Sequence, residues 1–152
     1  MKPSFLAEIP HEYILMPNIK GKDKPWGIGK KWSLEEAQHQ CPKDRYISCC
    51  YYLKDTPYAV VDIDDPNYTI DQLFEDTGID STYVVGNTKG FHVWVQFEQG
   101  KPDLFKKNFV DIGLHTTIDF LGEKVFERVG KDWVGSDLDP DRIYTIFGSD
   151  PT

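Results

Sequence analysis

The chain has 152 residues, of which 39% are hydrophobic and 14% aromatic, so it is long enough for one ordinary domain with a sizeable core. Its formal net charge of −8 argues against a protein that holds nucleic acid by general electrostatic attraction, because phosphate contacts need lysine and arginine on one face. No apolar run approaches the roughly 18 residues of a membrane span and the N-terminus does not resemble a signal peptide, so we expect a single domain (1–152) in an intracellular protein with no membrane partner.

The first segment that stands out is basic. Residues 18–32 hold five lysines against one aspartate, in a chain that is acidic as a whole. One basic loop therefore stands out against an acidic body.

The following segments predict a helix and two strands. Ser33 and Glu36 have the spacing of a capping box, so we expect a helix over 32–41. Residues 45–53 and 58–64 are rich in β-branched and aromatic side chains, and the turn formers of "KDTP" separate them. This pattern predicts two strands joined by a turn.

A second helix and a β-hairpin come next. Thr69 and Gln72 repeat the capping spacing, and the short helix that they begin should end at Gly78. Residues 81–86 and 91–97 flank "NTKG", which predicts two antiparallel strands joined by a tight turn.

The last third of the chain continues the mixture of helices and strands. Residues 102–109 have helical spacing of apolar side chains, and "TTIDFLG" with "KVFERV" predicts a second hairpin around Gly122 and Glu123. The tail is rich in turn formers and has one strand-like piece at 143–147. An α+β domain with antiparallel strand pairs fits this order of elements best.

Two carboxylates lie at the end of the predicted strand "YAVVDID". Side chains alternate along a strand, so Asp62 and Asp64 should share one face while Val61 and Ile63 point into the core. Paired carboxylates form an oxygen-rich site that suits Mg²⁺ or Mn²⁺. The alternative, with about equal weight for this segment alone, is that "DDPN" is a solvated turn.

Asp119 is a third carboxylate of the same kind, because it lies between Ile118 and Phe120 in a predicted strand. Three acids from two strands can hold two metal ions for an in-line phosphoryl displacement. Lys89 and His92 lie on either side of a glycine and could together grip a triphosphate. A lone histidine on a strand is more often a residue with a structural role, so His92 gains its interest from these neighbours.

The order of these motifs resembles that of the archaeo-eukaryotic primase superfamily. The resemblance rests on an Asp-x-Asp strand ("VVDIDD"), a hairpin with a small residue and a histidine ("TKGFHVWV"), and an apolar-Asp strand ("TIDFLG"). The chain is most similar to the primase-polymerase domains at the N-terminus of primase-helicases of large DNA viruses and mobile elements. The upstream "GKDKPWGIGKKWS" is similar to the Lys-Pro and Trp segment of those domains. The likeness covers about residues 20–130, and the order and spacing of the motifs carry it.

The resemblance implies an RRM-like catalytic core with a mainly antiparallel sheet and flanking helices. It implies that Asp62, Asp64 and Asp119 bind two Mg²⁺ or Mn²⁺ ions and that His92, with Lys89, contacts the triphosphate. It also makes the basic loop the place where template or nucleotide phosphates are expected, through Lys22, Lys24, Lys30 and Lys31. The alternative is a solvated loop, which carries at least equal weight for each lysine taken alone. The chain departs from the family in the second motif, which commonly begins with Ser where this chain has Lys89 and Gly90.

The implied activity is that of a DNA primase or polymerase, which joins NTPs or dNTPs along a single-stranded DNA template. A helicase module or subunit could supply most of the DNA affinity, so the chain fits the N-terminal part of a longer primase-helicase acting at a site of viral or plasmid replication. Its three cysteines include no Cys-x-x-Cys pair, so we expect no structural zinc.

Two other functions compete with this one. A replication-initiator nickase of the HUH type also uses a histidine on a central strand, but Trp94 occupies the position of its second histidine here. A primase-like module that has lost catalysis and only binds nucleotide or DNA is the other alternative. The presence of all three acids and of His92 argues against it.

Overall fold

The structure is a computed structural model that describes residues 2–19, 24–80, 82–87, 89–97, 118–134 and 142–146, with the backbone alone for 118–120, 132–134 and 146. Its elements in chain order are η1 (Ser4–Glu8), β1 (His11–Pro17), α1 (Leu34–Gln40), β2 (Arg45–Tyr52), β3 (Tyr58–Ile63), α2 (Ile70–Thr77), β4 (Tyr83–Gly86), β5 (Phe91–Phe97), β6 (Ile118–Leu121), β7 (Lys124–Arg128), β8 (Asp132–Val134) and β9 (Tyr144–Ile146).

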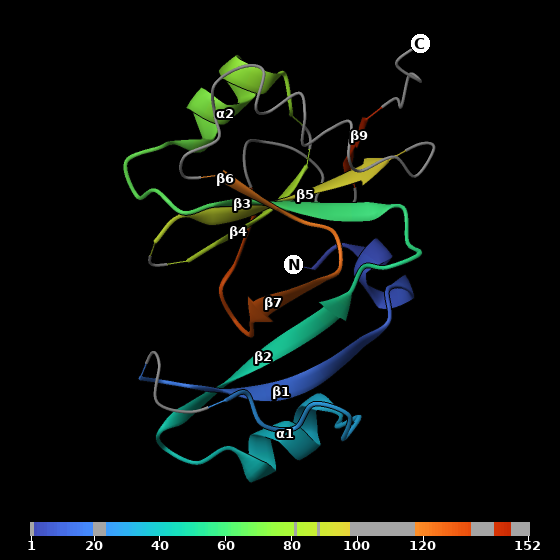
Figure 1. The fold of residues 1–152 in the computed structure, drawn as a ribbon, viewed down its shortest axis with the longest axis vertical. Helices are drawn as coiled ribbons and strands as arrows, with labels where there is room; N and C mark the ends of the chain where they lie inside the picture. The colour runs from blue at the N-terminus through green and yellow to red at the C-terminus, as the bar shows by residue number, and fades with distance from the viewer. Residues whose placement is uncertain are drawn as a thin grey trace.

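The strands form two sheets (Figure 1). Sheet A has three antiparallel strands in the order β1-β2-β7. Sheet B has six strands, in the order β6-β3-β5-β4-β8, with β9 added in parallel to the end of β5. The described chain is therefore a mixed α+β protein with mostly antiparallel sheets, as predicted.

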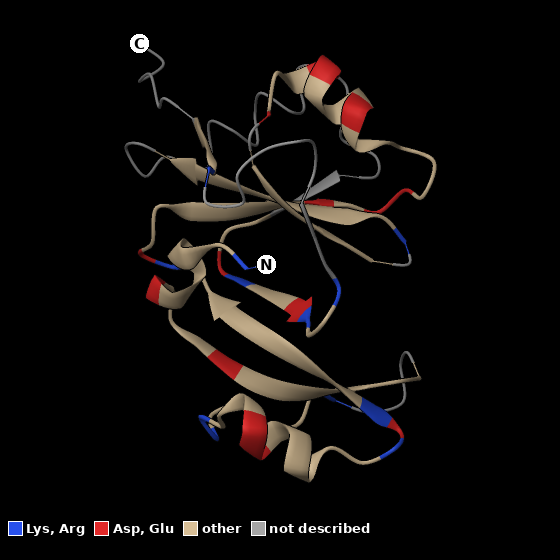
Figure 2. Ribbon diagram, turned by 180° about the vertical axis from the view of Figure 1, so that it is seen from behind, with Lys and Arg blue, Asp and Glu red and all other residues tan. Residues whose placement is uncertain are grey.

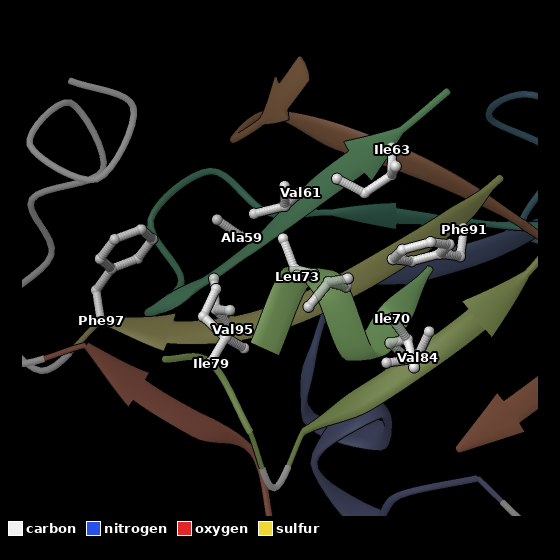
Figure 3. Close-up of a cluster of buried hydrophobic side chains, with 11 residues drawn as sticks. Ala59, Val61, Ile63, Ile70, Leu73, Ile79, Val84, Phe91, Val95 and Phe97 are labelled. Carbon is white, nitrogen blue, oxygen red and sulfur yellow. The ribbon is translucent and has the colours of Figure 1, made fainter. Parts of the chain in front are cut away.

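The elements stack in layers from α2 through sheet B and sheet A to α1 (Figure 1). One hydrophobic cluster fills the space between α2 and sheet B, where Leu73 points toward Val61 and Val95 (Figure 3). A second cluster, which includes Val60 and Trp94, lies on the other face of sheet B, against sheet A and η1. The central strands β3 and β5 are therefore buried on both faces.

Both predicted helix starts are confirmed. Ser33 and Thr69 each accept a hydrogen bond from the third residue of their helix, and the side chains of Glu36 and Gln72 complete the two capping boxes. Gly78 ends α2 in the left-handed conformation, which glycine adopts without a steric cost. Within the described part of the chain, no helix has the length and apolar character needed to cross a membrane.

The prediction of a hairpin around Gly122 and Glu123 is wrong. Both of its strands exist, but β6 pairs with β3 in sheet B and β7 pairs with β2 in sheet A, so the chain changes sheets in the short link between them. The carbonyl of Glu123 instead accepts a hydrogen bond from the backbone N–H of Leu53, at 2.7 Å. Pairing with β2 gives β7 five register partners in sheet A and packs Val125 into the core between the sheets.

The other strand predictions fare better. The hairpin of β4 and β5 is confirmed, and so are the strands at 45–53 and 58–64. Strand β9 confirms the piece predicted at 143–147 as far as Ile146. Strands β1 and β8 were not predicted, and the helix predicted at 102–109 lies outside the described residues.

Candidate active site

Asp62 lies on the central strand β3, between two residues of the predicted site. Its register partner on β5 is His92, and its register partner on β6 is Asp119. Residues directly opposite each other on antiparallel strands have Cα atoms about 4.5–5.5 Å apart. The sheet thus brings three of the predicted residues together at adjacent positions, although they are far apart in the sequence.

Asp64 follows directly after the end of β3 and lines the same pocket as Asp62. The close approach of Gly90 helps to fix this end of the strand, because a Cβ atom on Gly90 would lie 1.8 Å from the carbonyl oxygen of Ile63. The glycine is thus needed for the close contact with β3. Asp65 faces the turn instead, where its Oδ1 accepts a hydrogen bond from Asn67 N–H at 2.9 Å.

The pocket has a volume of about 320 Å³ and lies between the two sheets. Sheet B and its β4–β5 turn contribute Asp62, Asp64, Lys89 and His92, among others. The opposite wall comes from sheet A and the turn after it, and is formed by Tyr46, Ser48, Phe126, Glu127, Arg128 and Lys131. This volume falls at the lower end of the range for small-molecule sites.

His92 is held between two carboxylates from different sheets. Its Nε2 lies 3.2 Å from Asp62 Oδ1, and its Nδ1 lies 2.6 Å from Glu127 Oε1. An ionised carboxylate can only accept a hydrogen bond, so each ring nitrogen donates if both acids are charged. The same Oε1 of Glu127 accepts a hydrogen bond from the buried Trp94 Nε1 at 3.2 Å.

These contacts change the protonation of His92. Burial disfavours the charged imidazolium, but the hydrogen bonds and negative charges of Asp62 and Glu127 outweigh it and raise the pKa of His92 to about 10. His92 is therefore a cation at neutral pH in the metal-free protein. Both of its nitrogens already have partners, so it can contact a triphosphate only after it exchanges one of them.

Only some of the lysines that were predicted to contact phosphate lie at the pocket. Lys89 lines the pocket, but Lys24, Lys30 and Lys31 do not. Their loop is bridged to the edge of β1, which is the far side of sheet A from β7, and it lies beside α1 (Figure 2). Lys22 lies outside the described residues.

Other basic residues take the place of this loop at the pocket. Arg128 and Lys131 line it, and the guanidinium of Arg128 stacks on the ring of Tyr46, 4.3 Å from its centroid. Figure 2 shows basic and acidic segments side by side at the end of β7. The pocket therefore has both carboxylates and cations on each of its two walls.

The carboxylates fit a hard divalent cation. Asp62 and Asp64 offer oxygen ligands in one pocket, and Asp119 occupies the register position beside Asp62. Among the side chains that the structure describes, no three His, Cys, Asp or Glu residues are grouped to hold a metal ion. Asp119 is not among those side chains.

Sequence reasoning missed Glu127, Arg128 and Lys131. A local signal existed for Glu127, because it shares the period-two alternation of Val125, the inward-facing residue of the same strand. A carboxylate that points into the core needs a hydrogen-bond donor or a positive charge beside it. The sequence does not reveal that His92 is this partner.

No protein-family model, curated protein or solved structure matches the chain.

Proposed function

We propose that this protein is a divalent-metal-dependent nucleotidyltransferase that extends a nucleic-acid primer along a template, as primase-polymerase domains do. The observation that carries the proposal is the register of β6, β3 and β5, which places Asp119, Asp62 and His92 side by side next to Asp64. Three carboxylates and a histidine beside a pocket with basic walls form a site for a metal-bound triphosphate.

Asp62, Asp64 and Asp119 would hold the metal. Bound Mg²⁺ or Mn²⁺ supplies the Lewis acidity that activates a primer 3′-hydroxyl and neutralises the α-phosphate as pyrophosphate leaves. Like charges on adjacent strands repel one another, so a cation shared by these acids would relieve a cost that the metal-free protein carries.

The chain's own cations would bind the triphosphate. Lys89 from the β4–β5 turn and Arg128 and Lys131 from the opposite wall all line the pocket. Arginine can bind phosphate oxygens through two parallel hydrogen bonds, and its stacking on Tyr46 restricts its orientation. His92 would add a donor at Nε2 once Asp62 turns from the imidazole to the metal.

The fold also supports this proposal. A mainly antiparallel sheet with α2 over one face is compatible with the RRM-like core that the family resemblance implies. The nickase is less well supported, since Trp94 is fully buried in the core where the second histidine of that class would be needed.

Extension of a 5′-labelled primer on a single-stranded template, with Mn²⁺ and either dNTPs or NTPs, tests the proposal. The wild-type protein should extend the primer, and Asp62→Asn, Asp64→Asn and Asp119→Asn should each abolish extension. Asp80→Asn is the matched control, because Asp80 is an exposed acid that does not line the pocket. Nucleotide binding without extension would support the inert module, and a covalent tyrosyl-DNA adduct would support the nickase.

A further inference from the structure

Glu127 is a buried carboxylate that the proposed chemistry does not use. It is 5% exposed and lies on β7, in the sheet opposite the one that carries the three acids and His92. A buried carboxylate is costly unless it is hydrogen-bonded or paired. A residue of this kind on the wall of a candidate active site needs a structural or a functional explanation.

One oxygen of Glu127 makes two contacts with β5. Its Oε1 accepts from His92 Nδ1 at 2.6 Å and from Trp94 Nε1 at 3.2 Å. Trp94 is fully buried, so the second contact fixes the carboxylate against a rigid part of the core. The first contact then fixes the imidazole ring, with Nε2 directed toward Asp62.

The two partners of His92 differ in what the proposed function would require of them. Asp62 would turn to the metal, so its contact with Nε2 would be lost or weakened when the site is loaded. Glu127 would keep its contact with Nδ1, because it lies on the other sheet and is held by Trp94.

We propose that Glu127 is the positioning residue of His92, which holds the imidazole at Nδ1 so that Nε2 is presented to the triphosphate of a metal-bound nucleotide. This inference rests on the proposed function for the identity of the ligand, and on geometry alone for the hold on His92. Outer partners of this kind typically change affinity or activity by about 10–100-fold when they are removed.

Two substitutions separate the hydrogen bonds of Glu127 from its charge. Glu127→Gln keeps an Oε1 that can accept from both His92 and Trp94, so the ring orientation should survive. Glu127→Met has a similar length but no strong acceptor, so His92 Nδ1 loses its partner. Far-ultraviolet circular dichroism and the Trp94 indole signal in the NMR spectrum show whether each variant is folded.

The first measurement needs no metal or nucleotide. Long-range ¹H–¹⁵N NMR of the histidine rings in EDTA should show a protonated Nδ1 on His92 with a slowly exchanging proton in the wild type and in Glu127→Gln. The proton should exchange fast in folded Glu127→Met. Fast exchange in the wild type, or the same slow exchange in all three proteins, would overturn the hold on His92.

The second measurement is a double-mutant cycle on the affinity for a non-hydrolysable nucleoside triphosphate with Mn²⁺. Glu127→Met should weaken binding by about tenfold or more, and Glu127→Gln by much less. His92→Asn keeps a donor at the Nδ1 position but has no atom to replace Nε2, so in that background Glu127→Met should cost nothing further. An equal loss in both backgrounds would show that Glu127 acts on the fold and not through His92.

These arms also separate the two proposals. Wild-type protein that binds no Mn²⁺–nucleotide would overturn both the proposed function and the role of Glu127 toward a nucleotide, while the NMR measurement would still decide whether Glu127 holds His92. Nucleotide binding that is indifferent to Glu127→Met would overturn the positioning role and leave the proposed function intact.

Discussion

Asp62 and Asp119 are directly opposite each other on the antiparallel strands β3 and β6. Like charges at such positions destabilise a sheet, by an amount comparable to a favourable cross-strand pair, about 0.2–1 kcal/mol. This repulsion lowers the stability of the folded protein, and under the proposed function a bound cation would restore that stability.

Asp119→Asn should therefore have opposite effects without and with metal. In EDTA we expect the variant to be more stable than the wild type by up to about 1 kcal/mol, which is a rise in Tm of about 2–4 °C for a chain of this size. With Mn²⁺ the Tm of the wild type should rise with metal concentration, because the metal binds the folded state, and the Tm of the variant should rise less.

Differential scanning fluorimetry over a Mn²⁺ series measures both effects. Asp80→Asn, which removes an exposed acid elsewhere, should follow the wild type in both conditions. A metal response in Asp119→Asn equal to that of the wild type would remove Asp119 from the site.

The pKa of His92 predicts how stability depends on pH in the metal-free protein. The folded-state pKa is about 10, above the ordinary value of about 6.5, so the folded protein binds the proton more tightly than the unfolded chain. This contribution to the free energy of unfolding is complete below pH 6.5 and is lost as the pH rises toward 10. One proton changes the free energy by at most about 1.4 kcal/mol per pH unit.

Urea unfolding in EDTA between pH 7 and 8.5 should thus show stability falling with pH, and His92→Asn should flatten the slope. The slope that remains in His92→Asn includes Cys49 and Cys50, because burial raises their pKa values and stability is therefore also lost as the pH passes the ordinary thiol value of about 8.5. Equal slopes in the two proteins would show that His92 is not held as a cation.

Gly90→Ala tests the contact that fixes the end of β3. The added Cβ would meet the backbone of Ile63 at 1.8 Å, so one of the two strands must move. We expect a loss of about 3 kcal/mol in the free energy of unfolding, at the upper end for overpacking, and a displaced Asp64. Gly130→Ala is the control. A Cβ atom added there would have no neighbour within 4 Å, but Gly130 has a positive φ, so this variant measures the cost of backbone strain alone. A loss no larger than that of the control would contradict the contact.

The carboxylate of Glu12 fastens the basic loop to sheet A through the backbone of Gly29. It is buried on sheet A, where it accepts hydrogen bonds from Tyr52 Oη at 2.5 Å and from Gly29 N–H at 3.0 Å. Glu12→Ala should cost about 3 kcal/mol and speed tryptic cleavage at Lys30 and Lys31, since hydrogen bonds to charged groups are the stronger class.

Tyr52→Phe is the matched control for this effect, because it removes one donor and leaves Gly29 bound to the carboxylate. It should cost about 1.5 kcal/mol, the lower end for a hydrogen bond to a charged group, and leave cleavage at the loop nearly unchanged. Urea unfolding and timed digestion measure the two effects, and equal digestion rates in Glu12→Ala and the wild type would show that the loop is held by other contacts.

Local patterns predicted the elements whose causes are local. The capping boxes at Ser33 and Thr69 and the glycine after α2 are contained within a few residues, and they placed both helices correctly. The alternation of β5 and the turn formers before it predicted its hairpin with β4 in the same way. The strand patterns suggested that Asp62 and Asp119 share a metal site, and the family resemblance added His92 as a neighbour of these acids.

The failures involve partners that are distant in sequence. Gly122 and Glu123 carry an ordinary turn pattern, and no nearby residue reveals that β6 and β7 pair with different sheets. Glu127 could be recognised as an inward-facing acid, but its partner His92 is 35 residues away. The basic loop has a suitable charge, yet its pairing with β1 keeps it from the pocket.

Strand β7 has a further consequence for how the molecule is assembled. The chain leaves sheet B after β6, completes sheet A with β7, and returns to sheet B with β8. Cutting the chain between β2 and β3 would therefore separate the first two strands of sheet A from the third. Neither fragment would contain all the strands of both sheets, so we expect the two fragments to fold only when they are mixed. The pocket between the sheets would then form when the fragments associate.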